Sequence, residues 1–199
     1  MEGEGMRRLV VLVGLPGSGK TAFQKRHPEW AAVSKDAIRR EIFHCNFTPR
    51  YEDVVDRIFA SVLVEVIGSD VEVVCVDDLN LSRSVRSQLV ELALLSGREA
   101  IAYVMPSVDP DELYSRVQLS LAQLSASDPN ISVADFDRHR FDMLVRSYDP
   151  VDMREGFARV ESAEMPPDTT LAATRREVKG KPLRKKRIEK REPLPLFVP

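Results

Sequence analysis

Residues 14–21 read G-L-P-G-S-G-K-T, and this octapeptide constrains the fold more tightly than any other segment of the chain. The apolar run at residues 9–13 precedes it directly, and a short helical pattern at residues 22–26 follows it. Strand, glycine-rich loop and helix form the context in which G-x-x-x-x-G-K-[ST] binds phosphate, because glycines let backbone amides press close to an anion. The alternative is a glycine-rich turn without a ligand, and the flanking strand makes it the weaker interpretation.

The octapeptide predicts a site for ATP and Mg²⁺. Lys20 is expected to reach the β- and γ-phosphates, and the Thr21 hydroxyl is expected to bind Mg²⁺. Backbone amides of the loop are expected to supply the remaining hydrogen-bond donors. The residues predicted to bind the ATP phosphates are Gly14, Pro16, Gly17, Ser18, Gly19, Lys20 and Thr21.

Apolar periodicity alternates between strand and helix along the chain. Strand-like runs lie at residues 9–13, 31–34, 71–76, 100–104 and 157–160. Helical spacing lies at residues 36–43, 51–67, 82–96, 109–124 and within 131–148. Repeated strand–helix units predict an α/β fold, a P-loop NTPase with about five parallel strands and helices on both faces of the sheet. In such sheets ligands bind at the carboxyl ends of the strands.

Charge divides the chain into an acidic globule and a basic tail. The net charge is −2, but residues 175–191 hold ten lysines and arginines against two glutamates, a local charge of +8. The rest of the chain therefore carries −10. Apolar periodicity ends near Met165, and the two prolines that follow it end regular structure. We expect a P-loop kinase-like domain at residues 1–165 and a basic, extended or disordered tail at residues 166–199.

The tail and the composition limit the partners and the compartment. The densest basic run, residues 184–187, suits RNA, DNA or a ribonucleoprotein, and a solvated tail without a partner is the alternative. No run of eighteen apolar residues and no secretory signal occurs, so we expect an intracellular protein without membrane contact. Cys45 and Cys75 are too few for a disulfide framework, and the three histidines lack metal-ligand spacing.

The segment S-K-D-A-I-R, residues 34–39, follows the second expected strand and supplies the first catalytic candidates. A kinase that phosphorylates a hydroxyl needs a carboxylate to accept the proton and a cation to hold a charged acceptor. Asp36 and Arg39 lie three residues apart and share one face of a helix, so they are the candidates for these roles. The alternative is that Asp36 only stabilises a helix N-terminus while Arg39 is a surface residue.

Acidic and basic residues at two further strand ends complete the candidate site. Asp77 and Asp78 directly follow the strand expected at residues 71–76, the position from which P-loop enzymes reach Mg²⁺. The alternative is a strand-end turn, since aspartate and asparagine favour turns. Arg116, on the helix expected at residues 109–124, is a candidate lid cation, because negative charge builds on the transferred phosphate.

Four segments taken in order resemble the P-loop kinase domain of phage-type polynucleotide 5′-hydroxyl kinases: G-L-P-G-S-G-K-T, S-K-D-A-I-R, V-D-D-L-N-L-S and E-G-F-A-R-V. The resemblance spans about residues 7–162. It implies that Lys20 and Thr21 bind ATP phosphates and magnesium. It also implies that Asp36 is the general base and that Arg39 grips a phosphate of the acceptor.

The third segment and the lid carry the rest of the resemblance. Asp78 matches an aspartate that supports the active site in this family, and Asn80 matches the asparagine beside it. The family's lid helix usually carries two arginines four residues apart. Arg116 matches the first of them, but Ser120 stands at the second position, which is a departure from the family's pattern.

The expected function is ATP-dependent transfer of a γ-phosphate to a hydroxyl, with the 5′-end of a nucleic acid as acceptor. Arg39 and the basic tail favour a phosphate-bearing acceptor, whereas the acidic globule repels a nucleic acid backbone. One alternative is a small-molecule or RNA-linked hydroxyl as acceptor. Another is a catalytically weak nucleotide-binding scaffold that docks on RNA through the tail. A GTPase is disfavoured because the chain has no N-K-x-D motif.

Overall fold

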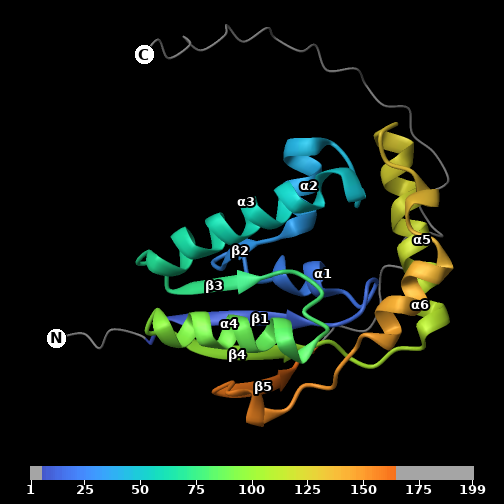
Figure 1. Cartoon of the computed structure of the whole chain (residues 1–199). Coiled ribbons are helices and arrows are strands. Elements are labelled where there is room, and N and C mark those ends of the chain that lie inside the picture. The colour runs from blue at the N-terminus through green and yellow to red at the C-terminus, as the bar shows by residue number, and fades with distance from the viewer. Residues whose placement is uncertain (1–5, 165–199) are drawn as a thin grey trace, which may run out of the picture. The chain divides into compact units, whose positions relative to one another are not determined.

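Five strands form one parallel sheet in the order β2-β3-β1-β4-β5 (Figure 1). The strands are β1 (Arg8–Val13), β2 (Ala31–Val33), β3 (Val73–Val76), β4 (Glu99–Val104) and β5 (Arg159–Ser162). The computed structural model describes residues 6–164. The chain divides into the units Met1–Met165 and Pro166–Pro199, so the expected tail lies outside the described residues. The predicted parallel α/β sheet is confirmed.

Helices connect the strands in alternation. They are α1 (Lys20–Gln24), α2 (Lys35–Phe43), α3 (Pro49–Gly68), α4 (Arg83–Leu95), α5 (Pro110–Ser127) and α6 (Arg138–Arg146), with short 3₁₀ turns at Val133–Asp135 and Met153–Glu155. Ser34 and Ser82 cap the starts of α2 and α4, because their hydroxyls accept hydrogen bonds from backbone amides three residues on. No helix within residues 6–164 is long and apolar enough to cross a membrane.

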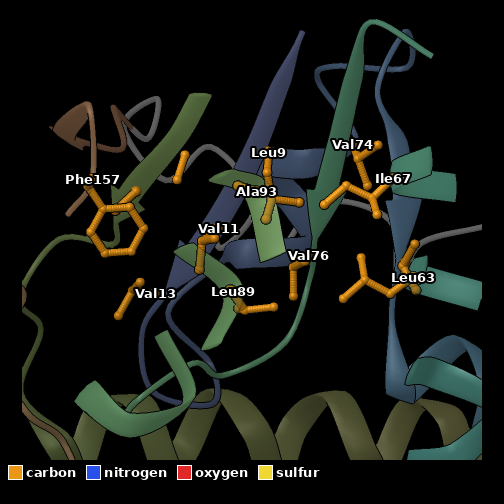
Figure 2. Close-up of a cluster of buried hydrophobic side chains, with 13 residues drawn as sticks. Leu9, Val11, Val13, Leu63, Ile67, Val74, Val76, Leu89, Ala93 and Phe157 are labelled. Carbon is orange, nitrogen blue, oxygen red and sulfur yellow. The ribbon is translucent and has the colours of Figure 1, made fainter. Parts of the chain in front are cut away.

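The helices α3 and α4 cover one face of the sheet (Figure 2). Leu63 and Ile67 on α3, and Leu89 and Ala93 on α4, repeat at helical spacing and point at the strands. The strand side chains that meet them are Leu9, Val11, Val13, Val33, Val74, Val76, Ala100 and Ala102. Phe157 adds a buried ring to this cluster. This packed face fixes the strands from which the loops of the candidate site emerge.

The opposite face of the sheet is covered by α1 and by the segment before β2. Phe23 on α1 is buried beside Val10 and Cys75, and Trp30 and Tyr103 pack against the same cluster. Burial raises the pKa of the Cys75 thiol, which agrees with an inert core residue. Helices therefore lie on both faces, as predicted.

Two strands begin later than their apolar runs predict. The third strand starts at Val73, because the carbonyl of Val71 accepts a hydrogen bond from Arg98 Nη1 at 2.7 Å. The fifth strand occupies Arg159–Ser162 and not residues 157–160, because Phe157 packs in the core before the strand begins. In both cases tertiary contacts shift the ends of an element whose type the sequence predicts correctly.

The carboxyl ends of β1, β3 and β2 meet at one edge of the sheet. Val11, Val76 and Val33 lie level with one another across these three strands, so the segments that follow them start close together. The amide of Gly14 donates to the carbonyl of Leu79 at 3.2 Å, which ties two of these segments directly. In Figure 1, α5 and α6 stand beyond this edge.

Candidate active site

The loop between β1 and α1 has the backbone that its glycines predict. Gly17 has φ of 80° and Gly19 has φ of 94°, in the left-handed region that favours glycine. A Cβ at Gly17 would also lie 2.6 Å from the Leu113 carbonyl oxygen of α5, so only glycine fits against that helix. The helix α1 has only five residues. Anion affinity at this loop therefore depends on the loop amides and Lys20 more than on a helix dipole.

Lys20 lies across the inner side of this loop. Its ammonium donates to the carbonyls of Gly14 at 2.8 Å and Leu15 at 2.9 Å. Burial lowers the pKa of Lys20 to about 8, and the negative charges of Asp77, Asp78 and Asp36 only partly offset that effect. The three carboxylates predicted for the site therefore act on the same buried cation.

Thr21 and Asp77 form the oxygen-rich side of the site. The Thr21 hydroxyl donates to Asp77 Oδ2 at 2.8 Å, although the two residues are 56 positions apart in the sequence. Burial raises the pKa of Asp77, while the hydrogen bond from Thr21 and the charge of Lys20 act in the opposite direction. A buried carboxylate beside a hydroxyl and a cation is the arrangement expected beneath a metal–phosphate complex.

The donor set fits Mg²⁺ better than a transition metal. Thr21 and Asp77 offer hard oxygen ligands, and Mg²⁺ is usually held by one or two such groups together with water and substrate phosphates. Within the described part of the chain, no three histidine, cysteine, aspartate or glutamate residues are grouped to hold a metal. A metal bound here would thus depend on the phosphates of a nucleotide for its other ligands.

Asp78 has partners different from those of its neighbour Asp77. Its Oδ1 accepts the amide of Leu79 at 2.8 Å, and its Oδ2 lies 3.6 Å from Lys35 Nζ. Lys35 also pairs with Asp56 on α3 at 2.9 Å. Burial opposes the charge of Lys35, but Asp56 and Asp78 outweigh it and raise the pKa of Lys35. Asp78 thus links β3 to the start of α2, and Asp77 faces Thr21.

Asp36 and Arg39 meet on one face of α2, as their spacing predicts. Arg39 Nη1 donates to Asp36 Oδ1 at 2.5 Å. The same guanidinium is held on its other side by Glu52 of α3, through hydrogen bonds of 3.0 and 2.7 Å. The side chain of Asp36 is 71% exposed, whereas that of Arg39 is 11% exposed. Asp36 is therefore open to an acceptor, and Arg39 is fixed between two carboxylates.

Asn80 braces the loop that carries the two aspartates. It has a positive φ of 49°, and its Nδ2 donates to the carbonyl of Leu12 in β1 at 2.8 Å. The side chain is buried at the junction of β1 and β3. This contact holds the end of the strand that leads into the phosphate-binding loop. Asn80, noted in the sequence only for its family resemblance, thus has a structural reason to be there.

A buried ion pair holds the backbone of the loop that contains Asn80. Arg86 of α4 and Glu155 form two hydrogen bonds of 2.8 Å, and both side chains have no solvent exposure. Arg86 Nη1 also donates to the carbonyls of Asn80 at 3.1 Å and Leu81 at 2.6 Å. Sequence reasoning missed this pair. Two features of the sequence could have indicated it: Arg86 lies on the apolar face of α4, three residues before Leu89, and the E-G-F-A-R-V segment begins with the acidic residue Glu155.

Arg116 lies on the helix that adjoins the phosphate-binding loop. Leu113 and Val117 of α5 approach Gly17, and Arg116 stands between them in the sequence. Its guanidinium pairs with Glu112 Oε1 at 2.7 Å, one turn earlier. Ser120, at the position of the expected second lid arginine, is exposed.

Comparisons with solved structures place this chain among P-loop folds. A candidate kinase from Chloroflexus aurantiacus is 15% identical, with a TM-score of 0.58 over 86% of this chain and 90% of that chain. Kti12 from Chaetomium thermophilum, in complex with ADP-AlF3, is 18% identical, with a TM-score of 0.56 over 84% and 93%. A chain of the Pnkp1/Rnl/Hen1 RNA repair complex is 18% identical, with a TM-score of 0.55 over 73% of this chain and 45% of that chain.

These likenesses bear out, at the level of the fold, the predicted resemblance to P-loop kinases. No curated protein matches the sequence of this chain. The comparison with protein families matches residues 9–143, about two thirds of the chain, to the AAA domain family AAA_33. That match covers the phosphate-binding loop, the segment with Asp36 and Arg39, the loop with Asp77 and Asp78, and the helix with Arg116. The chain belongs to the AAA domain family AAA_33.

Proposed function

We propose that this protein is an ATP-dependent kinase that transfers the γ-phosphate to a hydroxyl group, and that this acceptor is the 5′-hydroxyl of a nucleic acid. One observation carries the proposal: the exposed carboxylate of Asp36 follows β2 at the same edge of the sheet at which β1 leads into the loop that encloses the buried Lys20. A nucleotide-binding module without transfer has no need of an exposed carboxylate at that position. A kinase needs one, because the attacking hydroxyl must lose its proton.

The residues divide the reaction between them. Lys20 and the loop from Gly14 to Thr21 would bind the triphosphate, and Thr21 with Asp77 would hold Mg²⁺, which neutralises phosphate charge when bound. Asp36 would accept the proton of the acceptor hydroxyl. The bond between the γ-phosphorus and the β,γ-bridging oxygen would break as the acceptor oxygen bonds to that phosphorus. The products would be ADP and a phosphate monoester.

A phosphate-bearing acceptor suits the surroundings of Asp36. Arg39 and Arg140 both lie against Phe47, so two guanidinium groups stand beside the base, one of them paired with Asp36 and Glu52. A likeness in fold to a chain of an RNA repair complex, and the basic run of residues 175–191, favour a nucleic acid. The charge of −10 on the rest of the chain opposes nucleic acid binding, except where a local channel is positive.

Incubation with γ-labelled ATP and a panel of acceptors tests this function. The panel contains 5′-hydroxyl RNA, 5′-hydroxyl DNA, an RNA-linked aminoacyl hydroxyl and small polyols. Label on an oligonucleotide 5′-end is the expected result, and label on another hydroxyl would replace the proposed acceptor. Lys20→Ala should abolish transfer, because the phosphates lose their buried cation. Lys25→Ala, which removes an exposed lysine next to α1, should leave transfer unchanged.

The charges on α5, the helix expected to act as a lid, favour a second function: ATP binding without efficient phosphoryl transfer. Arg116 is paired with Glu112, and Ser120 replaces the second arginine that the resemblance predicts. With less positive charge over the transferred phosphate, the protein would bind ATP and act as a scaffold with weak or no turnover. Tight ATP binding with no label on any member of the panel would select this function and reject the kinase.

A further inference from the structure

A pocket of about 520 Å³ lies between the α2–α3 connection and the segment that leads into α6. Its lining includes Asn46, Phe47, Arg50, Tyr51, Asn130 and Arg140. Aromatic rings, amide groups and guanidinium groups are combined here, and an opening of this volume is in the range of small-ligand sites. None of these residues is among the catalytic, nucleotide-binding or metal candidates that the sequence motifs predict.

Phe47 connects this pocket to the proposed general base. The guanidinium of Arg140 stacks 3.2 Å from the centre of the Phe47 ring, and that of Arg39 lies 5.7 Å from the same centre. Arg39 in turn holds Asp36. The pocket therefore begins one side chain away from the residue pair at which the acceptor hydroxyl is expected.

Two guanidinium groups lie at this side of the pocket: Arg140 is in the lining, and Arg39, which pairs with Asp36 and Glu52, lies on Phe47. Burial lowers the pKa of Arg140, and the neighbouring positive charge of Arg39 lowers it further, while Glu52, Asp137 and Asp36 act in the opposite direction. A phosphodiester beside the pocket would accept charge-assisted hydrogen bonds from the guanidinium of Arg140. A polyol carries no charge, so its hydroxyls would form weaker hydrogen bonds with this guanidinium than a phosphodiester would.

The amide groups favour a ligand with a hydrogen-bonding edge. Asn46 Nδ2 is buried and finds no acceptor among residues 6–164. A buried donor without a partner costs free energy, so a bound acceptor atom at this point would be stabilising. Asn130 adds a second amide to the lining of the pocket. Asparagine amides match the donor and acceptor pattern on the edges of nucleobases.

We propose that this pocket receives the terminal nucleobase of the acceptor nucleic acid, with its 5′-hydroxyl directed toward Asp36. The base would stack on the guanidinium of Arg140, which itself lies over the Phe47 ring, and its edge would meet the amide of Asn46. The proposal rests on the proposed function, because it identifies what occupies the acceptor side of the same site.

Binding of short 5′-hydroxyl oligonucleotides to the full chain tests the pocket without requiring turnover. One oligonucleotide carries 2-aminopurine at its first position, a second carries it at an internal position, and a third has an abasic first position. Stacking should quench the fluorescence of terminal 2-aminopurine and leave the internal probe nearly unchanged. The abasic terminus should bind about tenfold more weakly, the loss expected for one stacked base.

Two variants and a matched control locate the effect. Arg140→Met and Asn46→Ala should each reduce the preference for a terminal base over an abasic one by severalfold. Arg146→Met removes an exposed arginine from the same helix, outside the pocket, and should keep the full preference. Circular dichroism spectra identical to that of the wild type establish that the variants fold. Equal preference in all four proteins overturns the assignment to this pocket.

The pocket and the kinase fail in different ways. Equal affinity for intact and abasic termini, or no oligonucleotide binding at all, overturns the nucleobase pocket whatever the enzyme phosphorylates. A preference for a terminal base without transfer of label to that oligonucleotide leaves the pocket standing and rejects the proposed kinase. Transfer of label at equal rates to intact and abasic ends supports the proposed kinase and rejects the nucleobase pocket.

Discussion

At the scale of single residues, Lys20 is the residue whose properties depend most on the rest of the candidate site. Its ammonium is buried and donates to two backbone carbonyls, and the negative charges of three carboxylates that follow β3 and β2 act on it. The motif made the position of this lysine predictable. Its lowered pKa was not predictable, because that value depends on burial and on residues that lie far away in the sequence.

Nucleotide binding should take up a proton near pH 8. Free Lys20, with a pKa of about 8, is about half protonated at that pH, and a bound polyphosphate would stabilise its charged form. The uptake should approach half a proton, and nucleotide affinity should fall as the pH rises above 8. Isothermal titration calorimetry in two buffers of different ionisation enthalpy measures this uptake. Lys25→Ala, which changes an exposed lysine, is the control and should take up the same fraction of a proton as the wild type. Equal binding enthalpies in both buffers, in both proteins, would show that Lys20 is already fully charged before the nucleotide binds.

Side-chain pairs within one helix can be predicted from the sequence, whereas pairs between distant elements cannot. The spacing of Asp36 and Arg39 on one helix face could be inferred, because it follows from helical periodicity alone. The pairing of Arg39 with Glu52 could not, since it depends on how α2 packs against α3. The same limit applies to Phe47 and Arg140, which meet across two elements that lie far apart in the chain.

At the scale of elements, the kind of each element could be predicted and its ends could not. Apolar periodicity located all five strands and the main helices. The starts of β3 and β5 differ from the apolar runs because Arg98 takes a backbone carbonyl and Phe157 packs in the core. Such contacts come from distant segments, so the apolar pattern within a strand does not predict them.

The pair formed by Arg86 and Glu155 should matter for stability and for the site together. Glu155→Gln removes one charge of a fully buried pair and should lower the free energy of unfolding by about 3–5 kcal/mol. Arg86→Met should lower it similarly and should also weaken nucleotide binding, because the carbonyls of Asn80 and Leu81 lose their donor. Urea denaturation and nucleotide titration measure the two effects.

A matched control exists on the same helix. Arg83→Met changes an exposed arginine at the first residue of α4 and should alter the unfolding free energy by less than about 0.5 kcal/mol. If Arg86→Met were as mild as this control, the buried pair would not be what supports the loop of Asn80.

At the scale of the whole molecule, charge is divided between an acidic part and the basic run of residues 175–191. That run lies outside the described residues, and its contact with nucleic acid remains a prediction from composition. Sequence reasoning could assign the tail a charge and a class of partner. It could not locate the pocket that we propose for the acceptor, because this pocket forms where the α2–α3 connection meets the segment before α6.

Removal of residues 168–199 should weaken nucleic acid binding and flatten its dependence on salt. Each lysine or arginine that neutralises a phosphate releases a counterion, so the slope of log affinity against log salt reports the number of such contacts. Fluorescence anisotropy with a labelled oligonucleotide at several salt concentrations measures that slope. ATP affinity is the internal control and should not change. An unchanged slope would assign the polyanion contact to another part of the chain.

The most direct test of the proposed chemistry is single-turnover phosphoryl transfer by Asp36→Asn, with ATP affinity measured on the same protein. Proton acceptance is lost while the phosphate-binding loop is intact, so transfer should fall at least about 10²-fold and ATP affinity should change little. Asp53→Asn, which alters an exposed aspartate on α3, should behave like the wild type. Transfer by Asp36→Asn at the original rate would contradict the assignment of Asp36 as the base and, with it, the kinase site.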